Sequence, residues 1–267
     1  MTSTPPRYPP TKPDSSHPAT AAIQNQVVTF FAAVFPASEP DAPGCFRRIT
    51  RQPHPLGNLA MIGPGVAPAT IAEVAAALVP VPSAVILLGG DDEAQAAPLT
   101  NLGFFLEESM CLMSVTREQL TPTPMPNGYR FVELTSEDDD RFIDAFAAGY
   151  ELPRPFAAMF SPDAAAGSGA SWRYFGAEQV EGGPLAAVSM CAVIDGQPGI
   201  YCVATLPEHR GKGLGAHLTA EPLRLAWQDG HTAGMLQSSA MGESVYRRIG
   251  FQSHGHMALY LQIPGAG

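Results

Sequence analysis

The chain has 267 residues, enough for one large domain or two small ones. It carries 15 Lys and Arg against 25 Asp and Glu, and the net charge of −10 argues against a nucleic-acid partner, because a phosphate backbone would repel it. Hydrophobic residues make up 45% of the chain, which excludes wholesale disorder. The longest apolar stretch, Thr70 to Gly90, is interrupted by Glu73, Pro80 and Pro82. We therefore expect no membrane span, no membrane partner and a cytoplasmic location.

The residues that commonly bind metals are scattered. The four cysteines form no Cys-x-x-Cys pair and no Cys/His cluster: Cys45, Cys111, Cys191 and Cys202. This spacing predicts neither a zinc site nor a disulfide framework. His254 and His256 alternate along one predicted strand, but the sequence offers no further ligands beside them. We expect no metal.

The first 128 residues predict a tail, a small α/β unit and a linker. Proline, serine and threonine dominate residues 1–20, which predicts a mobile tail. Apolar periodicity then predicts helices at 21–35 and 69–78, strands at 58–62 and 84–88, and a strand or pair of strands at 104–115. Three prolines and no periodicity in residues 121–128 predict a linker.

The second half predicts the order β-α-β-β-β-α-β-α-β. The expected strands are 129–134, 172–175, 185–194, 200–205 and 233–237, with a strand pair at 251–263. The expected helices are 138–150, capped by Ser136, then 214–228, which Pro222 should kink, and 242–249. We expect a loop at 162–169 and hairpin turns at 182–184 and 195–199. This order predicts an α/β fold with a mostly antiparallel sheet.

A glycine-rich loop is the most informative stretch. A strand ends at Thr205, and the loop Arg210-Gly-Lys-Gly-Leu-Gly215 opens directly into a helix. Glycines let the backbone turn tightly and approach a ligand closely. The free N–H groups and the dipole of a helix start favour an anion, and Arg210 and Lys212 add positive charge. The loop therefore predicts a phosphate or pyrophosphate site.

Two common phosphate loops do not fit this stretch. A Walker loop requires Ser or Thr after Gly-Lys, whereas Lys212 is followed by Gly213. A dinucleotide fingerprint requires Gly-x-Gly-x-x-Gly and an acidic residue about 20 positions later. Here the spacing is Gly-x-Gly-x-Gly, and Gly230, His231 and Thr232 stand at the later position.

The loop does resemble the acetyl-CoA-binding motif of the GNAT superfamily of N-acetyltransferases, Arg/Gln-x-x-Gly-x-Gly/Ala. Arg210, Gly213 and Gly215 occupy its fixed positions. Farther along, Tyr246, Gly250 and Phe251 are similar to the Tyr-x-x-x-Gly-Phe signature of that family. The two motifs come in the family's order, with a helix and a strand between them.

The resemblance implies a role for each residue of the site. Backbone groups of Val203, Ala204 and Thr205 would pair with the pantetheine arm of acetyl-CoA, as an added strand would. Arg210 would shape the loop, and its backbone N–H groups would hold the pyrophosphate: Gly211, Lys212, Gly213, Leu214, Gly215 and Ala216. Tyr246 would act as general acid to the departing thiolate while an amine attacks the thioester directly.

One position departs from the family pattern, and the general base is left open. Many members carry Asn seven residues before the Tyr, and Ser239 stands there in this chain. A hydroxyl can make one hydrogen bond to the coenzyme but not the pair that an amide makes. Candidates for the base are Glu178, His209, Glu208, Asp195 and Glu243, and none is assigned. Trp172 and Tyr174 either line the acceptor pocket or pack in the core.

A second, shortened copy is predicted in the first half. Leu102-Gly-Phe aligns with Ile249-Gly-Phe at an offset of 147 residues, and the following apolar alternation coincides. At this offset Tyr246 falls on Leu99, and no Arg or Lys stands near the aligned Gly63 and Gly65. The first copy should therefore lack a coenzyme site.

The resulting prediction is a GNAT-like, mixed and largely antiparallel sheet flanked by helices, present twice. The domains would be a tail (1–20), a degenerate GNAT-like domain (21–120), a linker (121–128) and a catalytic N-acetyltransferase domain (129–267). The predicted activity is acetyl transfer from acetyl-CoA to a small-molecule or peptide amine, by a monomer or homodimer. The alternative is a non-catalytic, acetyl-CoA-binding or structural tandem protein.

Overall fold

The computed structural model describes residues 18–34, 44–90, 92–165 and 171–264. In these ranges the strands are β1 Cys45–Ile49, β2 Asn58–Ile62, β3 Ser83–Leu87, β4 Phe105–Thr116, β5 Tyr129–Leu134, β6 Ser171–Gln179, β7 Leu185–Ile194, β8 Gln197–Thr205, β9 Ala233–Ser238 and β10 Gln252–Gln262. The helices are α1 Pro18–Val34, α2 Pro68–Ala76, α3 Glu93–Asn101, α4 Asp139–Tyr150, α5 Arg154–Ala157, α6 Pro162–Ala165, α7 Leu214–Gln228 and α8 Ala240–Arg248. Short 3-10 turns lie at Pro55–Gly57, Ser136–Asp138, Ala158–Phe160 and Pro207–His209.

All ten of these strands form one sheet, in the order β1-β2-β3-β10-β4-β9-β8-β7-β6-β5. Neighbouring strands are antiparallel except for two parallel pairs, β2 with β3 and β8 with β9. These parallel pairs lie at matching distances on either side of the central pair, β10 and β4. The mixed, largely antiparallel sheet predicted from the sequence is confirmed.

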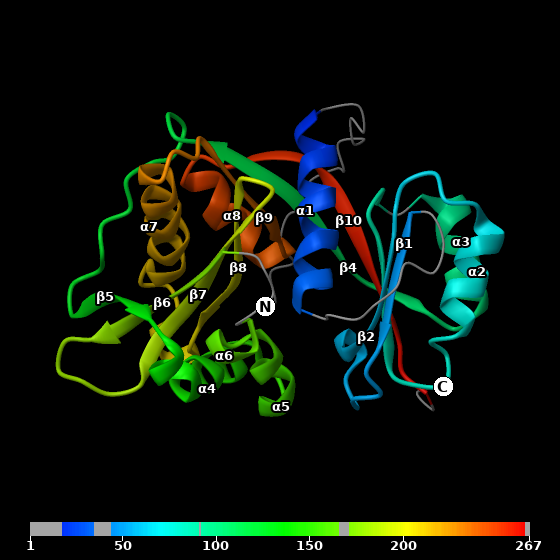
Figure 1. Cartoon of the computed structure of the whole chain (residues 1–267), viewed down its shortest axis with the longest axis horizontal. Coiled ribbons are helices and arrows are strands. Elements are labelled where there is room, and N and C mark those ends of the chain that lie inside the picture. Colours follow the sequence, from blue (N-terminus) through cyan, green and yellow to red (C-terminus); the bar gives the residue numbers. More distant parts are fainter. Residues whose placement is uncertain (1–17, 35–43, 91, 166–170, 265–267) are drawn as a thin grey trace, which may run out of the picture.

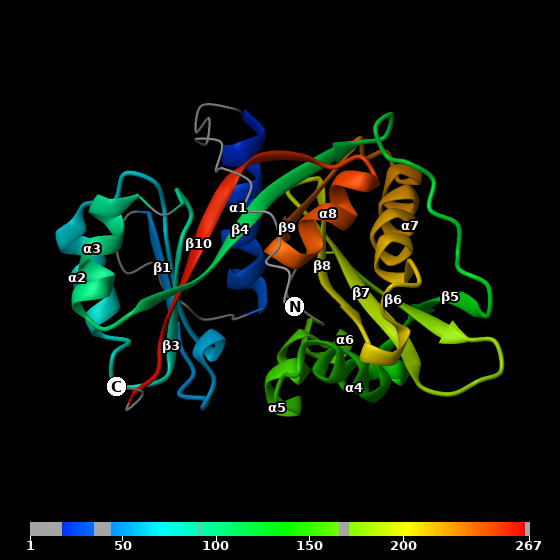
Figure 2. The ribbon, with the colours of Figure 1, turned by 180° about the vertical axis from the view of Figure 1, so that it is seen from behind.

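The central strands β4 and β10 exchange neighbours between the two halves of the chain. β4 precedes the predicted linker, yet it pairs with β9. β10 ends the second half, yet it pairs with β3. Figures 1 and 2 show the two long strands running together across the middle of the molecule. Neither half therefore has a complete sheet of its own.

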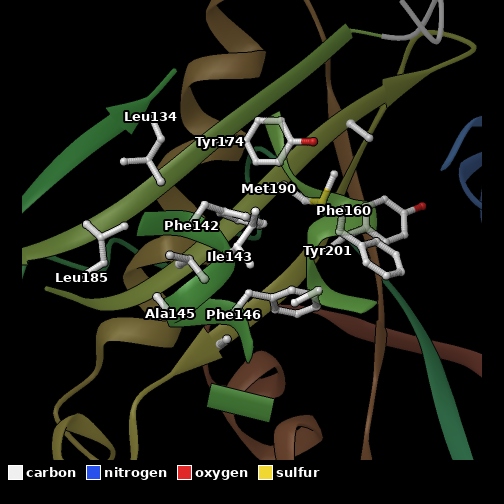
Figure 3. Packing of buried hydrophobic residues seen from close by; sticks show 14 of the residues in the cluster. Leu134, Phe142, Ile143, Ala145, Phe146, Phe160, Tyr174, Leu185, Met190 and Tyr201 are labelled. Carbon is white, nitrogen blue, oxygen red and sulfur yellow. The ribbon is translucent and has the colours of Figure 1, made fainter. Parts of the chain in front are cut away.

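Helices cover both faces of the sheet. On one face, α1 packs on β1, β2 and β3, while α4 and α5 pack on β7 and β8. On the other, α2 and α3 cover the first half and α7 and α8 the second. Figure 3 shows the apolar side of α4, with Phe142, Ile143 and Phe146 pointing toward Tyr174, Met190 and Tyr201 of the sheet.

Helix α1 joins the cores of the two halves. Its Ile23 and Val27 are fully buried against the strands of the first half. One turn after Val27, Phe30 stacks on Tyr201 of β8 with ring centroids 3.7 Å apart. The apolar face of one helix thus spans two cores, which ties the halves together along the sheet face seen in Figure 1.

Helix α7 continues through Pro222, where we expected a kink. Proline has no N–H, so the carbonyl of Leu218, four residues earlier, loses its partner within the helix. The hydroxyl of Ser189, on β7, donates to that carbonyl at 2.7 Å, and both residues are fully buried. The sheet therefore supplies the hydrogen bond that the helix lacks.

Removing that hydroxyl should destabilise the fold. We expect Ser189→Ala to lower the free energy of unfolding by about 1–2 kcal/mol, because the Leu218 carbonyl is left buried without a donor. Urea unfolding measures the change. The same substitution in a Pro222→Ala background should cost less, since the backbone N–H that this replacement restores can donate to that carbonyl; equal costs in both backgrounds would contradict this explanation.

Several predicted elements differ from the structure. The sequence analysis missed β1, α3 and the short α5, and it placed a loop where α6 begins. β10 is a single strand where we expected a pair, and β4 is the single strand of the two alternatives that we gave. The hydroxyl of Thr135, not of Ser136, caps the turn that leads into α4. The hairpin between β7 and β8 needs only Asp195 and Gly196, because both adopt positive φ, as a tight two-residue turn requires.

The predicted tail and the predicted linker both overlap described parts of the structure. The tail falls outside the described residues up to residue 17, and residues 18–20 already belong to α1. The predicted linker, residues 121–128, lies against α7: His217 Nδ1 is 2.7 Å from the Thr123 carbonyl, and Met125 packs on the core beneath that helix. The domain boundary at this segment stays a prediction.

Candidate functional site

The parallel strands β8 and β9 separate soon after they meet. Their only bridge joins Gly199 and Met235, although β8 continues to Thr205 and β9 to Ser238. On its other edge β8 stays paired with β7 as far as Thr205. The edge of Val203, Ala204 and Thr205 that faces β9 is therefore without a strand partner.

A bulge reshapes β8 where the strands separate. Cys202 has a φ of 52°, an uncommon value for a residue with a side chain. Between the pairs Met190–Tyr201 and Val188–Ala204, two residues of β8 oppose the single residue Ser189 of β7. A bulge of this kind bends the strand and increases its twist. The sequence analysis did not predict it.

The glycine-rich loop lies directly beside this open edge. Gly213 adopts a left-handed conformation, with φ 90°, at the N-cap of α7. The first N–H of α7 with a partner inside the helix is that of His217, which donates to the Gly213 carbonyl at 3.1 Å. The preceding N–H groups, from Gly213 to Ala216, therefore have no helical acceptor. They form the anion-binding end of a 15-residue helix.

Gly215 brings α7 close to β8. A Cβ at this position would lie 3.7 Å from Val203 Cγ1 and 3.8 Å from Thr205 Oγ1. The structure thus brings the loop and the predicted pantetheine-binding residues of β8 together.

Arg210 acts as a brace for the loop. Its Nε donates to the Thr205 carbonyl at 3.1 Å, and its Nη2 donates to the Gly149 carbonyl at 2.9 Å. Gly149 lies so close to β8 that a Cβ there would be 2.8 Å from Ala204 Cβ. The guanidinium therefore fixes the end of β8 and the C-terminal turn of α4 against each other, where a helix end favours positive charge.

Lys212 adds an exposed positive charge to the loop. Its Nζ donates to Tyr129 Oη at 3.0 Å, and His209 Nδ1 lies 2.8 Å from the same phenol oxygen. His209 is buried and held by this contact, which gives it a structural role. The Lys212 ammonium is exposed and has no carboxylate partner among the described residues.

Tyr246 projects from α8 toward the same region. Its side chain packs on the same apolar core under α7 as Val203 does, and its ring meets Phe251 edge-on at 5.9 Å. Gly242 leaves room for the ring, because a Cβ there would be 3.1 Å from Tyr246 Cε2. Burial raises the pKa of Tyr246 to about 12, and the Thr219 hydroxyl lowers it by less. The phenol is therefore protonated at neutral pH.

Ser239 has a local structural task. It is the N-cap of α8, and its hydroxyl oxygen accepts a hydrogen bond from the Gly242 N–H at 3.2 Å. The hydroxyl proton is not used by this bond and stays available to a neighbouring acceptor.

The other candidate residues fall outside this group. Glu178 lies within β6, where we expected a turn, and its carboxylate pairs with Arg130 and Arg141. Glu243 pairs with Arg247 along α8. The phenol of Tyr174 is buried and donates to the Ser161 carbonyl at 3.1 Å, which places this ring in the core.

Two residues that sequence reasoning missed do join the site. Tyr150, the last residue of α4, is 53% exposed, yet its phenol oxygen has enough of the chain around it that desolvation, and then the neighbouring Tyr246, Cys202 and Glu108, raises its pKa. Glu108, on β4, accepts a hydrogen bond from the Ala240 N–H at 2.9 Å. The one sequence signal for Glu108 was the Glu107-Glu108 pair, which interrupts an apolar strand.

The chain is similar to a known family in sequence and to solved structures in fold. Residues 155–258 match the family model described as acetyltransferase (GNAT) domain. A GCN5-related N-acetyltransferase from Kribbella flavida aligns over 91% of this chain and 96% of its own, with TM-score 0.67 and 19% identity. One from Sphaerobacter thermophilus aligns over 82% and 76%, with TM-score 0.60 and 14% identity.

A tandem GNAT protein from the clavulanic acid biosynthesis pathway is a third structural neighbour. It aligns over 78% of this chain and 76% of its own, with TM-score 0.53 and 16% identity. No curated protein matches the chain in sequence. The chain therefore has the GNAT fold, in which residues 155–258 carry the matched domain.

Three further observations concern the described part of the chain. None of its helices is both long and apolar enough to cross a membrane. Its His, Cys, Asp and Glu side chains form no group of three or more that could hold a metal ion. A surface pocket lined by Arg117, Arg224 and Trp227 lies at the opposite end of α7 from the glycine loop and includes none of the site residues.

Proposed function

We propose that this protein is an N-acyltransferase of the GNAT family that transfers an acetyl group from acetyl-CoA to a primary amine. One observation carries the proposal: the open edge of β8 meets the N-terminus of α7 at a glycine loop. Val203, Ala204 and Thr205 offer backbone groups to an extended amide chain, as an added strand would use them. The N–H groups from Gly211 to Ala216 offer an anion site for the pyrophosphate.

Tyr246 supplies the acid in this proposal. When the neutral amine attacks the thioester carbonyl, the N–C bond forms, the C–S bond breaks and the thiolate leaves with the electron pair, while the nitrogen gives its extra proton to solvent. The protonated phenol of Tyr246 gives that thiolate a proton, and its side chain packs on the same apolar core as Val203, on the α7 side of the sheet, which suits this role. Ser239, whose hydroxyl proton is free, would make a single hydrogen bond to the coenzyme.

The first half gives contrasting geometry at the corresponding strands. β2 and β3 are paired through four consecutive residues, from Leu59–Ala84 to Ile62–Leu87. No bulge interrupts the pairs of β2 with β1, and no edge is left for an added strand. We infer that the protein has a single coenzyme site, in the second half.

The turns after α3 and α8 support descent of the two halves from one ancestor. Each helix has nine residues, and the two are offset by 147 positions. Phe104 N donates to the Leu99 carbonyl and Phe251 N to the Tyr246 carbonyl, both at 3.0 Å. The glycine before each Phe has positive φ. We infer a tandem protein whose halves exchange their last strands; its cytoplasmic location and its oligomeric state stay predictions.

Calorimetric titration of acetyl-CoA into the protein and into Gly213→Asp tests the coenzyme site. We expect one equivalent to bind the wild type and none to bind the variant, because Asp adds negative charge at an anion site and strains a left-handed position. Gly196→Asp, also at positive φ but in the β7–β8 turn, is the matched control and should bind normally. Two equivalents would contradict the single site, and no binding to the wild type would contradict the enzyme.

A further inference from the structure

Strand β4, which precedes the predicted linker, reaches the site in the second half. It pairs with β9 as far as Cys111–Ser238, where β9 ends. From that last pair toward the start of β4, residues 110 to 105 extend past the end of β9. In this stretch β4 pairs only with β10. The register with β10 shifts between Glu108 and Leu106, so that Glu107 is the extra residue of a bulge. The exchanged strand therefore presents Glu108 at the start of α8.

The Glu108 carboxylate is only partly used by the fold. One oxygen accepts the Ala240 N–H at 2.9 Å and so caps the first turn of α8. No Lys, Arg or His of the described residues pairs with the carboxylate, and Glu108 remains half-buried. Its second oxygen and its negative charge are available to a ligand.

The surroundings of Glu108 are those of the proposed reaction. Its carboxylate caps α8, the helix that carries Tyr246, and its negative charge contributes to the raised pKa of Tyr150 at the end of α4. Tyr150 is 53% exposed, which keeps this side of the cluster open to an incoming molecule. Cys202, at the bulge of β8, also contributes to the raised pKa of that phenol.

We propose that Glu108 binds the ammonium group of the acceptor, which gives one proton to solvent before its nitrogen attacks the thioester, so that the first half of the chain completes the acceptor site and selects cationic amines. The inference rests on the proposed function. It explains why a half with closed β2–β3 pairing is retained: its last strand supplies a carboxylate with no ion-pair partner among the described residues, whereas Glu243, in the first turn of α8, pairs with Arg247. A carboxylate that receives an ammonium group makes a charge-assisted hydrogen bond.

The test compares Glu108→Gln with Glu107→Gln. Glutamine keeps an oxygen for the Ala240 N–H and removes only the charge, so the fold should be retained. Acetyl transfer is followed as release of free CoA thiol with benzylamine, tyramine and spermidine, and with aniline, whose amino group is uncharged at neutral pH. We expect Glu108→Gln to raise KM for the cationic amines by about 10- to 100-fold, with kcat within about threefold.

The controls separate this inference from the proposed function. Glu107→Gln should leave KM unchanged, aniline should respond equally to all three proteins, and acetyl-CoA should bind Glu108→Gln as it binds the wild type. An equal rise of KM in both variants, an unchanged KM in Glu108→Gln, or transfer to aniline alone would overturn the role of Glu108. Absence of transfer to every amine would also overturn it, while acetyl-CoA binding would still report separately on the coenzyme site.

Discussion

Tyr246→Phe is expected to lower kcat by about 10²- to 10⁴-fold, the usual contribution of a positioned general acid. The phenylalanine keeps the ring that packs against Phe251 and the core under α7, and it removes only the hydroxyl. Acetyl-CoA affinity should therefore change little, and the loss should appear in kcat. Steady-state kinetics with calorimetric binding measures both quantities.

The pH dependence of kcat is a second test of the role of Tyr246. Because burial raises the pKa of Tyr246 to about 12, the phenol stays protonated at every pH at which the reaction is commonly measured. We expect no fall in kcat from Tyr246 between pH 7 and pH 10. A rate that declines with an apparent pKa near 10, and whose decline disappears in Tyr246→Phe, would contradict the buried position of this phenol.

Tyr174→Phe is the matched control for the loss of a phenol. Its hydroxyl donates to the Ser161 carbonyl inside the core, away from the glycine loop. This variant should lose some stability and keep its kcat. If Tyr246→Phe keeps kcat as well, the protein does not use Tyr246 as an acid, and the non-catalytic alternative gains support.

The strength of the local sequence signal determined which elements could be predicted. Apolar periodicity correctly located α1, α2 and α7, and the runs of β-branched and apolar residues correctly located β2, β3 and β7. It failed for α3, whose nine residues include Pro98 and bury only Gln95 and Leu99. It also failed for β1, where Arg47 and Arg48 interrupt a five-residue strand.

The site could be predicted from the sequence only where its residues are adjacent in the chain. Its glycine loop is contiguous in the chain, so the sequence was sufficient to predict an anion site at the start of α7. The separation of β8 from β9 depends on the bulge at Cys202, for which neither glycine nor proline gave a signal. Glu108 lies 132 residues from its partner Ala240, and only the exchange of β4 and β10 brings them together. Chain order gave no indication of that exchange.

The crossing of the chain over α8 makes Gly250 sensitive to substitution. The segment between β4 and β5 passes over the end of α8, where Thr121 N donates to the Ile249 carbonyl at 3.0 Å. Gly250 has a φ of 106°, and a Cβ there would lie 2.1 Å from the Gln119 carbonyl oxygen. Gly103, after α3, has a φ of 84° and no atom within 4 Å of such a Cβ.

Gly250→Ala should therefore destabilise the protein much more than Gly103→Ala, although both glycines precede a buried Phe in the same kind of turn. We expect a loss of about 1 kcal/mol for Gly103→Ala, from left-handed strain alone, and about 3–4 kcal/mol for Gly250→Ala, where a backbone clash is added. Urea unfolding of both variants measures the difference. Equal losses would mean that residues 119–121 can move away from α8, so that their crossing would not hold the turn after Tyr246 in place.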